Sequence, residues 1–122
     1  MDMFKVIIAG GRDYDDYLRL ETFMDTVLGA KEHNTIEIVS GTANGADSLG
    51  EKYAIANEFA LTQFPAQWDK YGKSAGYKRN VEMVEYANAL VAFWNGNTVR
   101  SGTNHMINIA LERELPTRIV RY

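Results

Sequence analysis

The hydrophobic positions of this chain follow two spacings, one typical of buried strands and one typical of amphipathic helices. The run Phe4 to Ala9 is apolar at nearly every position, which predicts a strand buried on both faces. Similar runs rich in β-branched or other apolar residues complete a set of five predicted strands, at residues 4–9, 35–39, 61–64, 89–93 and 117–120.

Between these runs, apolar residues recur three and four positions apart, as on one face of a helix. The first such stripe consists of Leu20, Phe23, Met24, Val27 and Leu28, and the second of Ala46, Leu49, Gly50, Tyr53 and Ala54. Asp15 and Asp16 are suitable N-caps for the first helix, and Gly29 is a suitable end. Two further helices are predicted at residues 81–86 and 106–112, and the segment 65–76 is predicted to be a functional loop.

Five strands that alternate with four helices predict parallel crossovers, with helices on both faces of one sheet. We therefore expect an α/β protein, a single Rossmann-like three-layer α/β/α sandwich with a mainly parallel five-stranded sheet. The sequence has no internal repeat, low-complexity segment or domain boundary, so residues 1–122 are predicted to form a single domain.

Composition removes several classes of function. The absence of Cys excludes disulfide scaffolds, thiolate zinc sites and Cys nucleophiles. Apolar runs are short and the N-terminus lacks the pattern of a signal peptide, so a cytoplasmic protein without membrane association is expected. The net charge of −3 makes nucleic acid an unfavourable partner, although a local basic pocket is compatible with it.

Glycine, Ser/Thr and Arg gather where the predicted strands end, and parallel sheets bind ligands at that edge. The candidate ligand-binding residues after the first strand are Gly10, Gly11, Arg12 and Asp13. Those after the second are Ser40, Gly41, Thr42, Gly45, Ala46 and Asp47, and those after the fourth are Trp94, Ser101, Gly102 and Thr103. Each loop alone is ordinary turn chemistry, whereas their coincidence at one edge predicts a site for a nucleotide-like anion. Neither GxGxxG nor GxxxxGK[ST] is present, which argues against a standard dinucleotide dehydrogenase or P-loop NTPase.

The run SGTANGAD at 40–47 resembles the nucleotide-site motif of the SLOG superfamily, named for the Smf/DNA-processing protein A group and the Lonely Guy enzymes. More closely, the chain is similar to the YspA/cpYpsA-related SLOG family, a domain of unknown function. The motifs that carry this similarity are GGRDY at 10–14, SGTANGAD at 40–47, FPAQWDKYGK at 64–73, Arg79-Asn80, VAFW at 91–94 and SGT at 101–103. The resemblance implies a homodimeric Rossmann-like domain that binds a nucleotide or nucleotide-derived small molecule as a sensor or sequestering module.

A nucleotide-processing hydrolase or transferase, acting at an N-glycosidic or phosphate bond, is the alternative. Arg79 and Gly102-Thr103 match the Arg and GT of the Lonely Guy pattern, but Met106 stands at the position of its glutamate. A thioether cannot stabilise the developing cation as a carboxylate does, so Met106 favours binding over hydrolysis. If the chain is an enzyme, Asp47 and Arg79 are the candidate catalytic residues, and Glu51 can pair with Asp47 on one helical face. Placement of Asp47 near a helix N-terminus is an equally good structural explanation for it.

Aromatic and basic residues outside the helical stripes complete the candidate set. A base can stack on Trp68, while Lys70 and the pair Arg79-Asn80 supply charge and hydrogen bonds, and His105 lies close to the same edge. Only two His and no Cys are present, so no metal site and no cofactor are predicted, and Mg²⁺ is expected only through ligand phosphates. Single-stranded DNA binding, as in DNA-processing protein A, is a further alternative against which the acidic balance counts.

Overall fold

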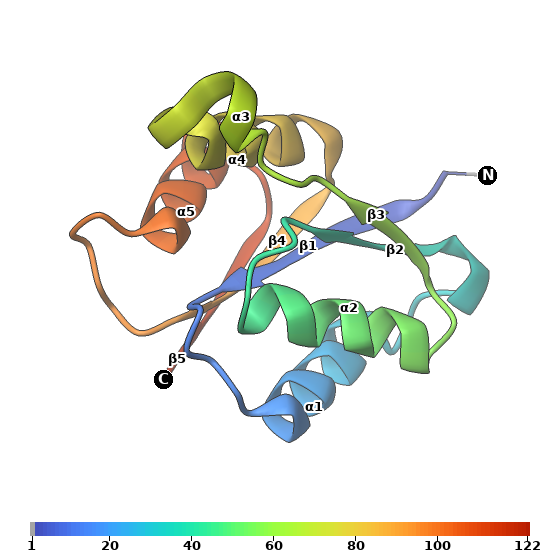
Figure 1. The fold of residues 1–122 in the computed structure, drawn as a ribbon. Coiled ribbons are helices and arrows are strands. Elements are labelled where there is room, and N and C mark those ends of the chain that lie inside the picture. Colours follow the sequence, from blue (N-terminus) through green and yellow to red (C-terminus); the bar gives the residue numbers. More distant parts are fainter. Residues whose placement is uncertain (1) are drawn as a thin grey trace.

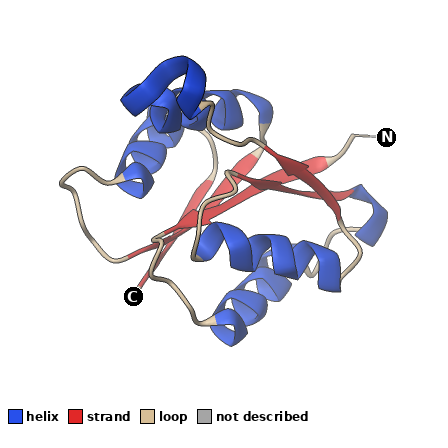
Figure 2. Cartoon of the chain, viewed as in Figure 1, coloured by secondary structure: helices blue, strands red, loops and turns tan. Residues whose placement is uncertain are grey.

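The computed structural model describes residues 2–122 and places five parallel strands in one sheet (Figures 1 and 2). The strand order is β3-β2-β1-β4-β5, so β1 is the middle strand, between β2 and β4, and β3 and β5 form the edges. Phe4 of β1 pairs with Ile36 of β2, and Val6 pairs with Ala89 of β4. The strands span β1 (Phe4–Gly10), β2 (Ile36–Ser40), β3 (Ala60–Gln63), β4 (Ala89–Trp94) and β5 (Thr117–Arg121).

Helices cover both faces of this sheet, with α1 and α2 on one side and α4 and α5 on the other (Figure 1). The helices span α1 (Tyr17–Leu28), α2 (Ala46–Ala56), α3 (Trp68–Tyr71), α4 (Ala75–Tyr86) and α5 (Gly102–Glu112). Two short 3₁₀ turns, η1 (His33–Thr35) and η2 (Gly72–Ser74), complete the described elements. The predicted Rossmann-like three-layer α/β/α fold with a parallel sheet is thereby confirmed.

The alternation of side chains along the strands divides the core into two layers. In β1, Val6 and Ile8 pack with α1 and α2, whereas Ile7 and Ala9 pack with α4 and α5. All four side chains are buried, which is why the residues that face either side of the sheet are apolar in this part of β1. Full burial of a Val or Ile side chain stabilises a fold by roughly 1.5–3 kcal/mol, so the central strands anchor both layers.

The prediction for residues 65–76 as a loop is wrong in part. The segment contains α3 and η2, and α4 begins at Ala75 and not near residue 81. The buried face of the first half of α4 includes the polar side chain of Asn80, so no apolar stripe reveals it in the sequence. Similarly, α5 begins at Gly102, earlier than expected, because Ser101 caps it by accepting a hydrogen bond from the Asn104 amide at 3.0 Å. Asp16 caps α1 as predicted.

The order of the strands creates a crevice at one edge of the sheet. The chain leaves β1 towards α1 on one face and leaves the adjacent β4 towards α5 on the opposite face. The connections after these two neighbouring strands therefore diverge, and a ligand site is expected between them. Within residues 2–122, every helix is too short or too polar to cross a lipid bilayer.

Candidate functional site

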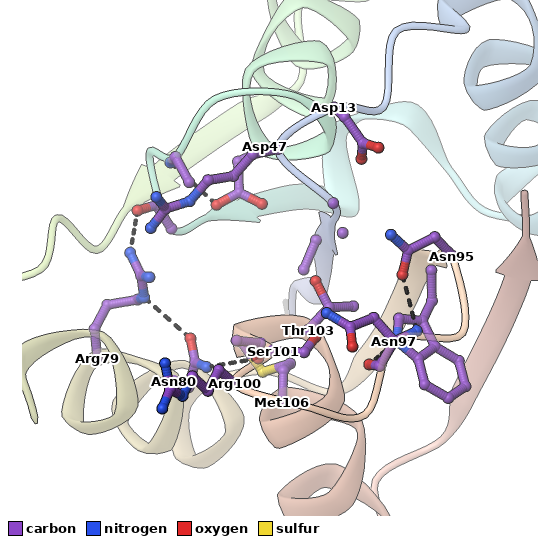
Figure 3. A pocket seen from close by; sticks show the side chains of 18 of the residues that line it. Asp13, Asp47, Arg79, Asn80, Asn95, Asn97, Arg100, Ser101, Thr103 and Met106 are labelled. Atoms are coloured by element: carbon purple, nitrogen blue, oxygen red, sulfur yellow. Dashed lines mark hydrogen bonds between the residues drawn. The ribbon is translucent and has the colours of Figure 1, made fainter.

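A cavity of about 460 Å³ opens at the carboxyl ends of β1 and β4, where the connections diverge (Figure 3). It is within the size range of small-molecule sites, and polar and charged side chains form much of its lining. Its walls come from four parts of the chain that are distant in sequence. The lining residues are Ala9, Gly10, Gly11, Arg12, Asp13, Gly41, Ala43, Asp47, Arg79, Asn80, Met83, Trp94, Asn95, Asn97, Arg100, Ser101, Gly102, Thr103 and Met106.

Glycines allow the end of β1 to approach its neighbours closely. The carbonyl oxygen of Gly11 accepts hydrogen bonds from the amides of Ala46, at 3.1 Å, and Tyr14, at 3.2 Å. A Cβ on Gly45, which has φ of +76°, would overlap that same oxygen, and a Cβ on Gly10 would overlap the backbone oxygen of Phe93. These contacts place the first turn of α2 against the end of β1 and fix one side of the cavity.

Asp47 is the buried carboxylate of the cavity. It lies in the first turn of α2 and is 6% exposed, and its Oδ2 accepts a hydrogen bond from the Ala43 amide at 3.1 Å. Burial raises the pKa of Asp47 to about 6, while the Ala43 hydrogen bond and the charge of Arg79 oppose this rise. A carboxyl group that titrates near neutral pH can accept or deliver a proton under cellular conditions.

Arg79, on α4, is the half-buried cation that faces this carboxylate. Its Nη1 donates to the backbone oxygen of Gly41, and its Nε donates to Oδ1 of Asn80 at 3.0 Å. Burial lowers the pKa of Arg79, and the charge of Asp47 opposes that shift. A Cβ on Gly41 would lie 2.9 Å from Oδ2 of Asp47 and 3.0 Å from Nη1 of Arg79. Glycine at position 41 therefore lets the carboxylate of Asp47 and the guanidinium of Arg79 occupy space that a side chain there would fill.

Asn80 joins α4 to the N-terminus of α5. It is 5% exposed, and its Nδ2 donates to the backbone oxygen of Gly102 at 3.1 Å and lies 3.2 Å from Nδ1 of His105. Because the Nε of Arg79 can only donate, the Asn80 oxygen must face it, and the Asn80 amide must face His105. Nδ1 of His105 is therefore an acceptor, and the proton of this neutral imidazole is on Nε2. Burial lowers the pKa of His105, which also favours the neutral ring.

The rim of the cavity carries further charge of both signs. Arg12 and Arg100 are exposed and come from the connections after β1 and β4. Asp13 accepts a hydrogen bond from the hydroxyl of Tyr122 at 2.6 Å, and burial together with this bond raises the pKa of Tyr122. Three arginines from three segments and two carboxylates thus line the cavity.

The structure brings together most residues that the sequence singles out and leaves others outside. Predicted residues that line the cavity are Gly10, Gly11, Arg12, Asp13, Gly41, Asp47, Arg79, Asn80, Trp94, Ser101, Gly102 and Thr103. Predicted residues that do not line it are Ser40, Thr42, Gly45, Ala46, Trp68, Lys70 and His105.

The second group has other contacts. Ser40 donates to Glu51 at 2.6 Å, and Glu51 also accepts from Gln63 at 3.0 Å. These bonds hold Glu51 on β2 and β3, so it does not pair with Asp47 at the cavity. Gly45 packs against the backbone oxygen of Gly11, and the amide of Ala46 donates a hydrogen bond to that oxygen. His105 contacts the lining residue Asn80.

Other lining residues lie outside the predicted set. Arg100 and Asn97 come from the connection between β4 and α5, and Met83, Ala9 and Ala43 form parts of the walls. Arg100 directly precedes the Ser101-Gly102-Thr103 run, and this position in the sequence is the signal that could have identified it as a lining residue. Within residues 2–122, no cluster of three or more His, Asp or Glu side chains is arranged to hold a metal ion.

Comparisons with known proteins agree with this architecture. The model of the YspA, cpYpsA-related SLOG family matches residues 4–71. The chain is 31% identical over 120 residues to the Gene 61 protein of Mycobacterium phage D29, covering 93% of this chain and 94% of that protein.

Two solved structures of DNA processing protein A share the fold at 15% sequence identity. The protein from Streptococcus pneumoniae matches with a TM-score of 0.71, and the protein from Helicobacter pylori, described for its single-stranded DNA binding mode, with 0.65. Each match covers 97% of this chain, which spans 50% and 65% of those two chains respectively.

Proposed function

The chain belongs to the YspA, cpYpsA-related SLOG family, and on that premise we propose that its cavity binds a nucleotide or a nucleotide-derived small molecule. The observation that carries this proposal is the convergence of Arg12, Arg79 and Arg100 on one cavity at the switch point of the sheet. Guanidinium groups bind phosphate through paired, charge-assisted hydrogen bonds, and the fold directs them to one place. In this proposal the protein holds its ligand as a sensor or sequestering module.

The phosphate end of the ligand is assigned to the side formed by α4 and α5. Arg79 and Arg100 supply positive charge there, and the first turn of α5 adds the amides and hydroxyl of Gly102 and Thr103. The amides at a helix N-terminus favour anions, by roughly 0.3–1 kcal/mol per charge at exposed positions. A Cβ on Gly102 would meet no atom within 4 Å, so a phosphate has room to approach this backbone.

The sugar is assigned to the side that carries Asp13 and Asp47. Carboxylates accept hydrogen bonds from hydroxyl groups, and each of these two has one oxygen engaged by the protein and a second one for a ligand. Buried Met83 and Met106, on α4 and α5, also line the cavity and offer an apolar contact. The site thus combines the three chemistries of a nucleotide: anion, hydroxyls and an apolar ring face.

Turnover of the ligand is the second candidate, and Asp47 is the observation that favours it. Its pKa of about 6 suits a group that exchanges a proton near neutral pH, and Arg79 is placed to hold a phosphate beside it. Asp13 and Asp47 are the only carboxylates that line the cavity in the described chain, and Met106 adds none. Hydrolysis or transfer at an N-glycosidic bond would therefore depend on Asp47.

Single-stranded DNA binding is a third candidate, suggested by the Helicobacter pylori structure and by one local feature. Lys70, Lys73, Lys78 and Arg79 lie close together in the sequence with Asp69 as the single opposing charge. A cluster of this kind can contact a phosphate backbone, although the chain as a whole carries a net charge of −3.

A thermal-shift screen of nucleoside mono- and diphosphates, cyclic nucleotides, ADP-ribose derivatives and a dT₂₀ oligonucleotide tests all three candidates. A ligand at 100 times its Kd stabilises the folded protein by about 2.7 kcal/mol, which gives a clear rise in Tm. Each ligand that raises Tm is then recovered and identified by mass spectrometry. Recovery unchanged supports binding alone, whereas recovery as free base or dephosphorylated product supports turnover. A screen in which no nucleotide raises Tm contradicts the proposal.

A further inference from the structure

An aromatic and basic surface lies beside the cavity and is not part of its lining. We call it the α3–α4 platform, and it consists of Trp68, Lys70, Tyr71, Tyr77 and Lys78. The short helix α3 lies next to the N-terminal part of α4, on the same side of the sheet as α5 (Figure 1). The platform therefore adjoins the side of the cavity to which we assign the phosphate.

The two outer aromatic rings of the platform are open to solvent. Trp68 is 52% exposed and Tyr77 is 45% exposed, so neither acts mainly as an anchor that buries a loop against the core. Tyr71 is partly buried and has two ammonium groups over its ring, those of Lys70 at 5.0 Å and Lys78 at 4.9 Å from the centroid. Large exposed aromatic rings with adjacent cations are the features that bind unstacked nucleobases.

Arg79 connects this platform to the cavity. The Cη2 atom of Trp68 and the Nη2 atom of Arg79 both lie within 4 Å of the position that a Cβ on Gly76 would take. Nη1 of the same guanidinium donates to Gly41 at the cavity wall. Nη1 of Arg79 thus contacts the cavity wall, and Nη2 lies beside Gly76, against which Trp68 also packs. The ring centroid of Tyr77 lies 4.4 Å from that of His105. Asn80 makes polar contacts with both His105 and Arg79, and so connects this pair of rings to the guanidinium.

Charge favours an anionic ligand across this region. Residues 65–79 contain four cations and one carboxylate, a local charge of +3 in a chain whose net charge is −3. A ligand that reaches from the cavity to Trp68 passes the guanidinium of Arg79, where a phosphate is the matching group. A single nucleoside phosphate in the cavity would leave both exposed rings unused.

We propose that the α3–α4 platform is a second base-binding subsite, and that the ligand is a two-base nucleotide whose linking phosphate lies at Arg79. One nucleoside occupies the cavity and the second base stacks on Trp68. This inference rests on the proposed nucleotide binding in the cavity and adds the length and the two-base character of the ligand.

The test compares the Kd of adenosine 3′,5′-bisphosphate (pAp) with that of the dinucleotide pApAp, by calorimetry. Stacking of one base on an aromatic side chain supports a gain of roughly tenfold, so pApAp is expected to bind about ten times more tightly than pAp. In the Trp68→Ala variant the ratio of the two Kd values is expected to approach one, and Trp68→Phe is expected to restore most of it. Leu18→Ala, which truncates an exposed apolar side chain on α1, is the matched control and should keep the tenfold ratio. Circular dichroism confirms that each variant is folded.

The possible failures are distinguishable. If pAp binds but pApAp binds no more tightly, the second subsite is refuted and the cavity proposal stands. A Trp68→Ala variant that keeps the tenfold ratio also refutes the subsite. If affinity continues to rise steeply from pApAp to a ten-base oligonucleotide, the platform is a track for a polymer and the two-base ligand is wrong. If neither pAp nor pApAp binds, the two-base ligand is refuted, and the cavity proposal also fails if no nucleotide of the thermal-shift screen raises Tm.

Discussion

The two sides of the cavity have similar residue types but different construction. We call residues 10–13 and 41–47 the packed wall, and residues 95–103 the open wall. In the packed wall, a Cβ on Gly10 or Gly45 would overlap a backbone oxygen of another segment. In the open wall, a Cβ on Gly102 would meet no atom within 4 Å. Gly96, at the start of the same wall, differs from Gly102, because a Cβ there would overlap the guanidinium of Arg121. Glycine therefore serves the protein's own packing in the packed wall and at Gly96, and leaves space for a ligand at Gly102.

This difference shows why glycine in a strand-to-helix connection is ambiguous evidence for a ligand site. The packed wall uses its backbone polar groups internally, since the Gly11 oxygen accepts two amide hydrogen bonds. In the proposed site, this wall contacts the ligand through side chains, chiefly that of Asp47. In the open wall, Val99 is 69% exposed and Arg100 adopts φ of +50°. The connection before them is held by hydrogen bonds of Asn97 with Trp94, Asn95 and Val99. Backbone amides and Arg100 remain available to a ligand there.

The largest effect that would test the comparison is the loss of stability on substitution of Gly45 by Ala. Gly45 combines φ of +76° with ψ of −125°, a conformation that only Gly adopts readily, and its Cβ would overlap the Gly11 oxygen. Gly45→Ala is expected to lower the free energy of unfolding by about 2–4 kcal/mol. Urea unfolding measures this change, and a loss below 0.5 kcal/mol would show that the packed wall can relax.

The next effect concerns the charge that the packed wall buries. Because the pKa of Asp47 rises from its ordinary 3.8 to about 6, the folded protein retains a proton between these values that the unfolded chain has released. The free energy of unfolding therefore falls as pH rises through this window, and the loss persists at pH 7. Asp47→Asn is expected to raise stability at pH 7 by about 3 kcal/mol, since one pKa unit corresponds to about 1.4 kcal/mol.

Urea titrations of both proteins from pH 4 to pH 7 check this expectation. The difference between Asp47→Asn and the unmodified protein should shrink below pH 5, where the buried carboxyl is protonated. Parallel curves across this range would show that Asp47 is ionised in the folded state at acidic pH. The same variant separates binding from turnover, since any hydrolysis of a ligand should fall by at least 100-fold while binding persists.

Arg79 links the two walls, and its substitution should weaken ligand binding more than stability. It donates to Gly41 in the packed wall, and through Asn80 it is joined to Gly102 in the open wall. Arg79→Gln removes the charge while keeping a side-chain donor, and we expect the Kd for pAp to rise at least tenfold. Arg118→Gln, on the edge strand β5, is the matched control and should leave the Kd within twofold. Equal effects of the two variants on the Kd would mean that binding depends only on the overall charge of the protein.

The sequence determines the fold more completely than the site. Strands and most helices follow from periodicity, because burial on one or both faces constrains residue type at every second or third position. Periodicity does not reveal the first half of α4, because Asn80 interrupts the apolar stripe. Asn80 is buried and makes three polar contacts. The loops after the strands identify the edge where the cavity lies, since parallel strands bring these ends together.

Sequence alone could not separate the residues that face the cavity from those that support it. Ser40 and Asp47 lie within one motif, but the side chain of Ser40 contacts Glu51, whereas Asp47 lines the cavity. The direction of each side chain depends on the three-dimensional path of the loop and on partners distant in sequence. For the same reason, the exposure of Trp68 beside Arg79 emerges only when α3 is placed against α4.

The smallest predicted effect on stability is also the sharpest test of the open wall. Gly102 is the first residue of α5 and has no neighbours around its missing Cβ, so Gly102→Ala should raise the free energy of unfolding by about 0.4–1 kcal/mol. The added methyl group enters the cavity where we assign the phosphate, and the Kd for pAp should therefore rise several-fold. A variant that is more stable and yet binds more weakly would separate the two uses of glycine within one site. If Gly102→Ala gains stability and keeps its affinity for pAp, the ligand does not approach this backbone and the phosphate belongs elsewhere in the cavity.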